Sequence, residues 1–178
     1  MTTDYFILGL SSSAHAAIRR VHSETPDRGR AHYAGKASNY LLHGGAAAAT
    51  ARGYRDCIER YIAWDGNADP AVDLPTKGLP ISFGQGDIVR SRPDVVLGPD
   101  EQSGAYDVRV LLLDELRLDR RAAEMIALAA HEYVWAQFGT NSTALVNVWQ
   151  LARGEGETVT ATEAEGRRTE VEALLAAI

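Results

Sequence analysis

Residues 92–117 carry the segment RPDVVLGPDEQSGAYDVRVLLLDELR, which decides the fold. It holds the end of one apolar run rich in β-branched residues, 88–97, and the whole of a second, 107–113. Such runs favour β-strands. The segment 98–105 between them contains Gly98-Pro99 and Gly104, which is typical of a loop joining two strands. We therefore expect an antiparallel hairpin here, with the rest of the chain arranged around it.

The sequence after the hairpin predicts one helix, two strands and a last helix. Asp119 is placed to cap a helix over 119–138, in which apolar residues recur on one face. Strands are expected over 143–151 and 157–161. Thr162 and Glu165 have the spacing of a capping box, which predicts a final helix to residue 178.

The sequence before the hairpin is mostly helical in character. Ser11–Ser13 are expected to cap a helix over about 13–22, and the alanine-rich stretch 36–64 is expected to form another. Glycine and proline mark 23–35 and 65–80 as loops. A short strand is expected near 79–83.

This order of elements predicts an α+β fold, an α/β three-layer arrangement. A helical N-terminal part, 1–65, is expected to pack on a mixed-sheet core with helices, 66–178. The core has the order βββαβ and ends in a C-terminal helix. With 178 residues, the two parts are expected to form one domain overall.

Composition excludes several classes of protein. The chain is 46% hydrophobic and 24% charged, as in an ordinary globular protein rather than a disordered one. A single cysteine, Cys57, cannot form an internal disulfide, so a cytoplasmic location is expected. No apolar run reaches the roughly 18 residues that span a bilayer, so no membrane partner is expected.

Charge is divided unevenly along the chain. Residues 1–55 hold seven basic and three acidic side chains, a balance of +4, whereas 56–178 hold eleven basic and twenty-one acidic, a balance of −10. The first part is thus able to face a polyanion such as DNA. The alternative is a simple bias in composition, since the chain has sixteen arginines and only two lysines.

Acidic side chains are placed at the ends of the two hairpin strands. Asp94 opens one strand, and Asp114 and Glu115 follow the other. If the strands pair, these oxygens come near one point, which suits Mg²⁺ or Mn²⁺. The helix over 53–64 offers Asp56 or Glu59 as a further ligand. The alternative is that these acids are ordinary turn residues.

Pro93-Asp94 and the triplet Glu115-Leu116-Arg117 resemble motifs of the PD-(D/E)XK nuclease superfamily, in its RecB-like branch. The resemblance covers about 40–150. It implies an αβββαβ core with a metal held by Asp94, Asp114 and Glu115, and by His43 on a preceding helix. The lysine of the triplet is absent: Leu116 follows Asp114-Glu115, and Arg117 is the nearest cation. The resemblance implies that Arg117 takes the lysine's place beside the scissile phosphate.

Two functions follow from this resemblance. In the first, the protein acts on or docks beside DNA, with Mg²⁺- or Mn²⁺-dependent phosphodiester hydrolysis. In the second, the same fold is catalytically inactive and serves as a scaffold that binds a protein partner or self-associates. A third possibility is an unrelated α+β domain whose acids are structural.

Two other motifs are incomplete. Gly9-Leu10-Ser11 resembles the start of a nucleophile elbow but lacks its final glycine, and a helix cap is the simpler interpretation. His131-Glu132 begins like a zinc-protease helix, but Trp135 stands where the second histidine is required. His131 is therefore expected to be a surface or partly buried helix residue.

Overall fold

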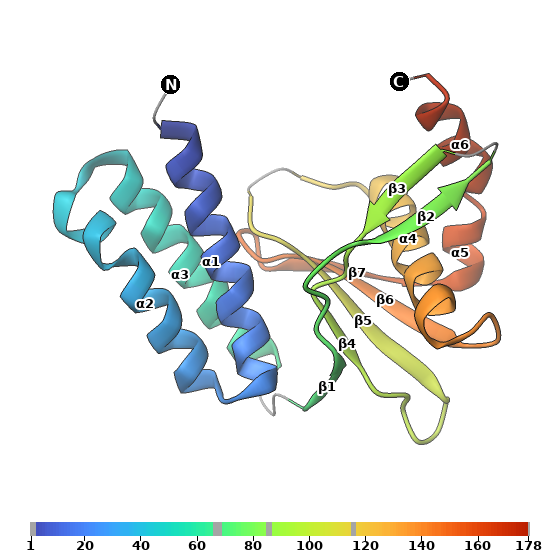
Figure 1. The fold of residues 1–178 in the computed structure, drawn as a ribbon, viewed down its shortest axis with the longest axis horizontal. Helices are drawn as coiled ribbons and strands as arrows, with labels where there is room; N and C mark the ends of the chain where they lie inside the picture. The colour runs from blue at the N-terminus through green and yellow to red at the C-terminus, as the bar shows by residue number, and fades with distance from the viewer. Residues whose placement is uncertain (1–2, 66–68, 85–86, 115–116, 178) are drawn as a thin grey trace. The chain divides into compact units, whose positions relative to one another are not determined.

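The structure, a computed structural model, describes residues 3–65, 69–84, 87–114 and 117–177. The chain divides into two compact units. The helical unit comprises Met1–Pro70, Leu112–Glu115 and Gln150–Gly154. The sheet unit comprises Ala71–Leu111, Leu116–Trp149 and Glu155–Ile178. Figure 1 shows the elements of both. The expected α+β class, with helices that precede a mixed sheet, is confirmed.

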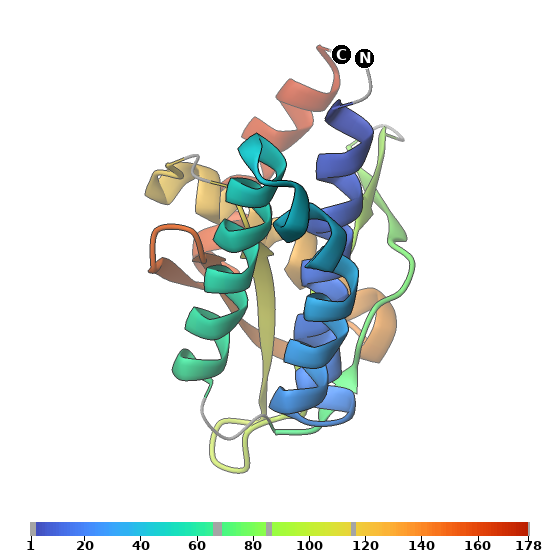
Figure 2. The ribbon, with the colours of Figure 1, turned by 90° about the vertical axis from the view of Figure 1, so that its left-hand side faces the viewer.

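Three helices form the helical unit: α1 (Thr3–Ser23), α2 (Pro26–His43) and α3 (Gly45–Trp64). They lie alongside one another and pack pairwise (Figure 2). Their shared core combines small and large side chains, so the helices approach closely at the alanines. Its members are Leu10, Ala14, Ala17, Ile18, Val21, Tyr33, Ala37, Ala48, Ala51, Cys57, Ile58 and Tyr61.

The helix boundaries differ from the expected ones. α1 begins at Thr3, so Ser11–Ser13 lie inside a helix and cap nothing. Ser13 instead donates its hydroxyl to the carbonyl of Gly9 at 2.8 Å, a bond that serine makes within helices. α2 occupies much of the expected loop 23–35, because Thr25 accepts a hydrogen bond from Arg28 N and Pro26 suits the first helical turn.

The sheet unit holds a five-stranded sheet in the order β1-β4-β5-β6-β7 and a separate hairpin, β2–β3. The strands are β1 (Ala71–Asp73), β2 (Leu79–Phe83), β3 (Asp87–Ser91), β4 (Val95–Leu97), β5 (Ala105–Leu112), β6 (Thr143–Gln150) and β7 (Glu155–Thr160). β1 falls in the expected loop 65–80.

The predicted hairpin is present in the five-stranded sheet, but the expected run 88–97 is divided between β3, which pairs with β2, and β4. β4 and β5 are antiparallel, with Val95 opposite Arg109 and Leu97 opposite Asp107. β6 follows β5 through helix α4 (Arg120–Phe138). Residue 147 of β6 contacts residue 107 of β5, and further along the chain residue 151 contacts residue 112. Because the residue numbers of the two partners increase together, β5 and β6 run parallel.

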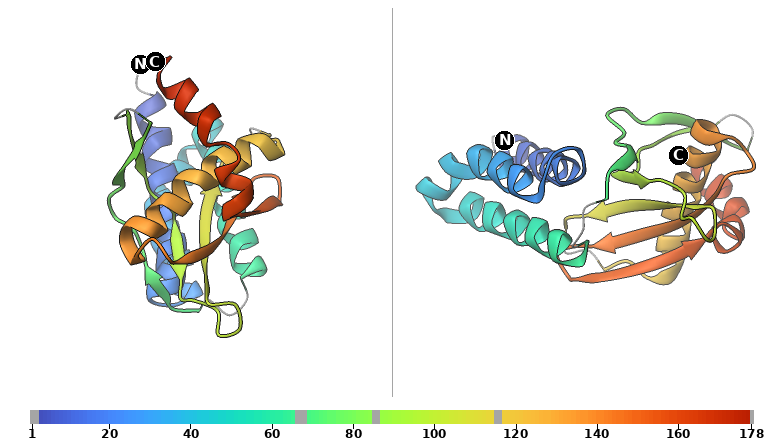
Figure 3. Two further views of the ribbon diagram at one scale, coloured as in Figure 1. Left: turned by 90° about the vertical axis from the view of Figure 1, so that its right-hand side faces the viewer. Right: turned by 90° about the horizontal axis from the view of Figure 1, so that it is seen from below.

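Helix α4 packs against β7 and the β2–β3 hairpin. It begins where the sequence predicts, with Asp119 accepting a hydrogen bond from Ala122 N at 2.8 Å. Two short helices, α5 (Ala161–Glu165) and α6 (Arg168–Leu175), follow β7 (Figure 3). The capping box is formed by Thr160 and Glu163, two residues earlier than expected, and Gly166 separates the two helices.

Candidate functional site

Asp94 lies just before β4 and is buried, with 8% of its surface exposed. Its backbone N–H donates to the carbonyl of Arg109 at 2.8 Å. Its carboxylate Oδ2 accepts a hydrogen bond from the backbone N–H of Leu111 at 2.8 Å. The Asp94 side chain therefore contributes directly to the pairing of β4 with β5.

Asp114 is exposed and lies two residues after β5 ends, in the segment that groups with the helices. It lines a cavity of about 480 Å³. Most of the wall comes from α3, and Leu113 and Ala152 complete it. We call this the α3 cavity. The α3 residues that line it are Ala49, Thr50, Gly53, Tyr54, Asp56, Cys57 and Arg60.

Two of the carboxylates considered in the sequence, Asp56 and Asp114, line this cavity. Asp56 lies 3.6 Å from Arg55 Nε. Glu59, the other acid considered on this helix, does not line the cavity; it accepts hydrogen bonds from Arg30 at 2.9–3.0 Å. Asp56 is thus the α3 acid that accompanies Asp114.

The phenol of Tyr54 stays protonated in this cavity. Burial raises the pKa of Tyr54, and the nearby Cys57 and Asp114 raise it further, although a hydrogen bond with Ser11 opposes the shift. Burial also raises the pKa of the Cys57 thiol to about 11. Cys57 is therefore a neutral thiol near pH 7 and a poor nucleophile, whereas Tyr54 retains a proton to donate.

Arg60 adds a cation to the cavity wall. Its Nη1 donates to the carbonyl of Leu151 at 2.8 Å and to the carbonyl of Ala152. These bonds join α3 to the segment after β6, 91 residues away in the sequence. This contact has no local signal in the sequence, because it depends on tertiary structure.

Among the described residues, the predicted site residues Asp94 and Arg117 do not line the cavity. Arg117 is exposed in the segment before α4 and belongs to the sheet unit, as does Asp94. Glu115 and Leu116 lie outside the described residues. His43 is the last residue of α2, and its side chain is also outside the description. The convergence of these residues on one metal ion stays a prediction.

The donor set of the cavity suits Mg²⁺ better than a metal that needs a complete protein cage. Within the described parts of the chain, no three His, Cys, Asp or Glu side chains form a group that could hold a metal. Mg²⁺ is commonly bound through one or two carboxylates, with water and substrate phosphate as its other ligands. Asp56 and Asp114 fit that arrangement.

His131, from the incomplete zinc motif, is a core residue with 1% of its surface exposed, contrary to the expected surface or partly buried position. It packs against Trp135, with ring centroids 6.4 Å apart. Burial lowers the pKa of His131, although the carbonyls of Val159 and Thr160 and the charge of Glu132 oppose this shift. It is therefore buried as neutral imidazole and does not face a metal-binding group.

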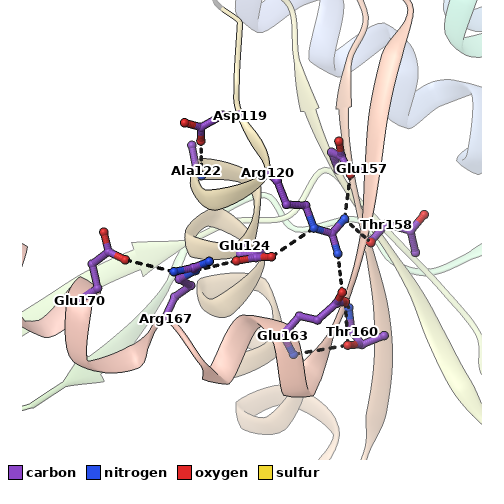
Figure 4. Close-up of polar contacts among 10 residues, drawn as sticks. All are labelled: Asp119, Arg120, Ala122, Glu124, Glu157, Thr158, Thr160, Glu163, Arg167 and Glu170. Atoms are coloured by element: carbon purple, nitrogen blue, oxygen red, sulfur yellow. Dashed lines mark hydrogen bonds and ion pairs between the residues drawn. The ribbon is translucent and has the colours of Figure 1, made fainter.

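A network of ion pairs lies in the sheet unit (Figure 4). Arg120 bonds Glu124 at 3.1 Å, Glu157 at 2.8 Å and Glu163 at 2.6 Å. Arg167 bonds Glu124 at 2.6 Å, so this carboxylate joins the two arginines. Because these charges are paired with one another, the network ties α5 and α6 to α4 and offers no reactive group.

A second cavity, about 360 Å³, lies within the sheet unit between the β2–β3 hairpin, α4 and α6. We call it the hairpin groove. Its wall is almost wholly apolar and includes Phe83, Val89, Met125 and Ile126, whereas Arg90 and Arg92 add polar groups. It suits contact with an apolar surface and lacks the groups needed for hydrolysis.

The sequence matches no model of a known protein family and no curated protein. None of the helices in the described residues is long and apolar enough to span a membrane.

Proposed function

We propose that this protein has a PD-(D/E)XK-like nuclease fold and acts on DNA through a divalent ion held in the α3 cavity. The observation that supports this most strongly is the position of Asp114. The sequence resemblance assigns Asp114 to a metal site, and its side chain lines a cavity that also contains Asp56. The order hairpin, helix α4 and parallel strand β6 agrees with the core that the resemblance implies.

Each residue of the cavity has a role in this proposal. Asp56 and Asp114 would hold the ion, and the Tyr54 hydroxyl would donate a hydrogen bond to a phosphate oxygen. A bound Mg²⁺ or Mn²⁺ supplies a Lewis acid and an activated water for phosphodiester hydrolysis. The resemblance also assigns Asp94 and Glu115 to the metal, but Asp94 belongs to the sheet unit and Glu115 lies outside the described residues, so neither enters this proposal. The proposal places the protein in the cytoplasm, with DNA as its partner.

A second function is favoured by different observations. The Asp94 carboxylate is bonded to the backbone of Leu111, and Leu116 takes the place of the motif lysine. The hairpin groove also offers an apolar surface. A catalytically inactive fold that binds a protein partner or self-associates has these properties.

Cleavage of labelled single- and double-stranded DNA in Mn²⁺ tests the first function against the second. Asp114→Asn is the informative variant, because Asp114 is exposed and removal of its charge should not disturb the core. Glu59→Gln is the matched control, since Glu59 lies on α3 but outside the cavity. We expect cleavage by the wild type and by Glu59→Gln, and loss of cleavage in Asp114→Asn.

Thermal unfolding in Mn²⁺ gives a second measurement that does not depend on turnover. A ligand that binds the native state alone raises the melting temperature by mass action. We expect Mn²⁺ to stabilise the wild type and to have a smaller effect on Asp56→Asn and Asp114→Asn. If the wild type shows neither cleavage of DNA nor stabilisation by Mn²⁺, the metal site is contradicted and the scaffold function remains.

A further inference from the structure

The position of Arg60 bears on how a substrate is held in the α3 cavity. Its Nη1 is fixed by the carbonyls of Leu151 and Ala152. Within the described residues, its hydrogen bonds all go through Nη1. The Nε and Nη2 groups of the same guanidinium remain able to donate to a ligand in the cavity that Arg60 lines.

The charges of the cavity determine what such a ligand can be. The charged side chains that line the cavity, Asp56, Asp114 and Arg60, sum to −1, and Arg55, whose Nε lies 3.6 Å from Asp56, brings the local sum to 0. Without a metal, the net charge of the cavity therefore does not attract a phosphodiester. A divalent ion on the two carboxylates would raise the local sum to +2, which attracts one. Phosphate binding through Arg60 therefore depends on prior binding of the metal.

We propose that Arg60 is the substrate-binding cation of this site and contacts the phosphodiester next to the metal. This inference rests on the proposed function and assigns to Arg60 the role that the sequence resemblance gave to Arg117. The guanidinium fork forms two parallel bonds to phosphate oxygens, a geometry that a lysine ammonium does not offer. The two carbonyl bonds orient the fork before the substrate arrives.

Binding of a short, fluorescein-labelled oligothymidylate, followed by anisotropy in Mn²⁺ and in EDTA, tests this assignment. We expect Arg60→Gln to weaken Mn²⁺-dependent binding at least about tenfold, as for loss of a charge-assisted hydrogen bond. Arg60→Lys should be intermediate, because it keeps the charge and loses the fork. Arg52→Gln is the matched control: Arg52 is an exposed arginine on α3 outside the cavity, and its loss should have little effect.

Two further measurements separate substrate binding from a purely structural role of Arg60. The salt dependence of DNA affinity should become shallower by about one phosphate contact in Arg60→Gln. The stabilisation of the protein by Mn²⁺ should persist, because Arg60 does not bind the metal. The assignment is overturned if Arg60→Gln binds the oligonucleotide as tightly as the wild type and with the same salt dependence. Absence of Mn²⁺ stabilisation in the wild type instead overturns the proposed function itself.

Discussion

The carboxylate of Asp94 accepts a hydrogen bond from the backbone N–H of Leu111, which joins the start of β4 to the end of β5. Leu111 is 2% exposed and Asp94 is 8% exposed, so water does not readily replace this bond. Asp94 thus has a structural role whether or not it also binds a metal. An activity assay on an Asp94 variant alone does not separate the two roles.

Asp94→Ala should therefore lower the free energy of unfolding by about 1–3 kcal/mol, the cost of a buried N–H left without its acceptor. Asp94→Asn should lose less, because its amide oxygen can still accept from Leu111. Urea unfolding of the two variants measures this difference. Asp114→Ala, at an exposed position, should stay within about 0.5 kcal/mol of the wild type. Equal stability of Asp94→Ala and the wild type would contradict the structural role.

The elements predicted correctly from the sequence are those with local signals. Asp119 caps α4 through a bond to Ala122, three residues away, and the β4–β5 hairpin follows from its apolar runs and loop. The first part of α2, 26–35, is predicted as a loop because Pro26 and Gly29 are typical of loops, whereas 36–43 lies in a stretch that is predicted to be helical. In the structure, Pro26 occupies the first turn and Gly29 allows α1 to approach, which is a tertiary effect.

The residues of the candidate site also differ in whether a local signal in the sequence points to them. Asp114 and Asp56, which line the cavity, are candidates from the sequence because acids at a strand end and on the preceding helix are visible there. Arg60 was missed because its anchors, Leu151 and Ala152, are more than 90 residues away. Tyr54 and Cys57 belong to the apolar stripe of α3, and the sequence pattern does not distinguish a cavity wall from a core.

Two glycines of α2 should respond oppositely to the same substitution. A Cβ on Gly29 would lie 2.6 Å from the carbonyl oxygen of Ala17 and 2.9 Å from Val21 Cγ2, so Gly29→Ala forces α1 and α2 apart. A Cβ on Gly35 meets nothing within 4 Å. Gly29→Ala should destabilise the protein by about 1–3 kcal/mol. Gly35→Ala should stabilise it by about 0.5–1 kcal/mol, because alanine is the better helix former.

Denaturant unfolding of both glycine variants measures the two changes under the same conditions. Each variant controls for the other, since both place the same methyl group in the same helix. A loss of stability in Gly35→Ala comparable to that in Gly29→Ala would show that the close approach to Ala17 is not the cause.

Helix α6 should separate from the sheet unit at acid pH. None of its residues is buried, and it is held by ion pairs, among them Glu170 with Arg121 and Arg168 with Glu132. The pKa of Glu170 is lowered chiefly by its bond to Arg121, and the pKa of Glu165 by its bond to Arg168. A carboxyl group whose pKa is lowered in the folded protein stabilises it fully above pH 4.5, the ordinary pKa of the group. This stabilisation is lost as the pH falls through the lowered pKa of the folded protein.

The backbone chemical shifts of residues 168–175, followed by NMR from neutral pH to below 4.5, measure this change. We expect α6 to lose its helical shifts while α4, which has a buried face, keeps them. Glu170→Gln should lower the helical content of α6 at neutral pH as well. Helical shifts in α6 that persist after its carboxyl groups have titrated would contradict the dependence on ion pairs.

His131 should make the whole protein less stable at mildly acid pH. Its pKa is lowered by burial, so the unfolded chain binds a proton more readily than the folded protein. The free energy of unfolding is therefore highest, as far as His131 is concerned, above pH 6.5, the ordinary pKa of histidine, and it falls as the pH decreases below that pKa. This range lies above the one in which α6 is released. His131→Leu, which keeps an apolar side chain in the core, should reduce the loss of unfolding free energy between pH 7.5 and 5.5. A pH dependence in His131→Leu equal to that of the wild type would assign the effect to other groups.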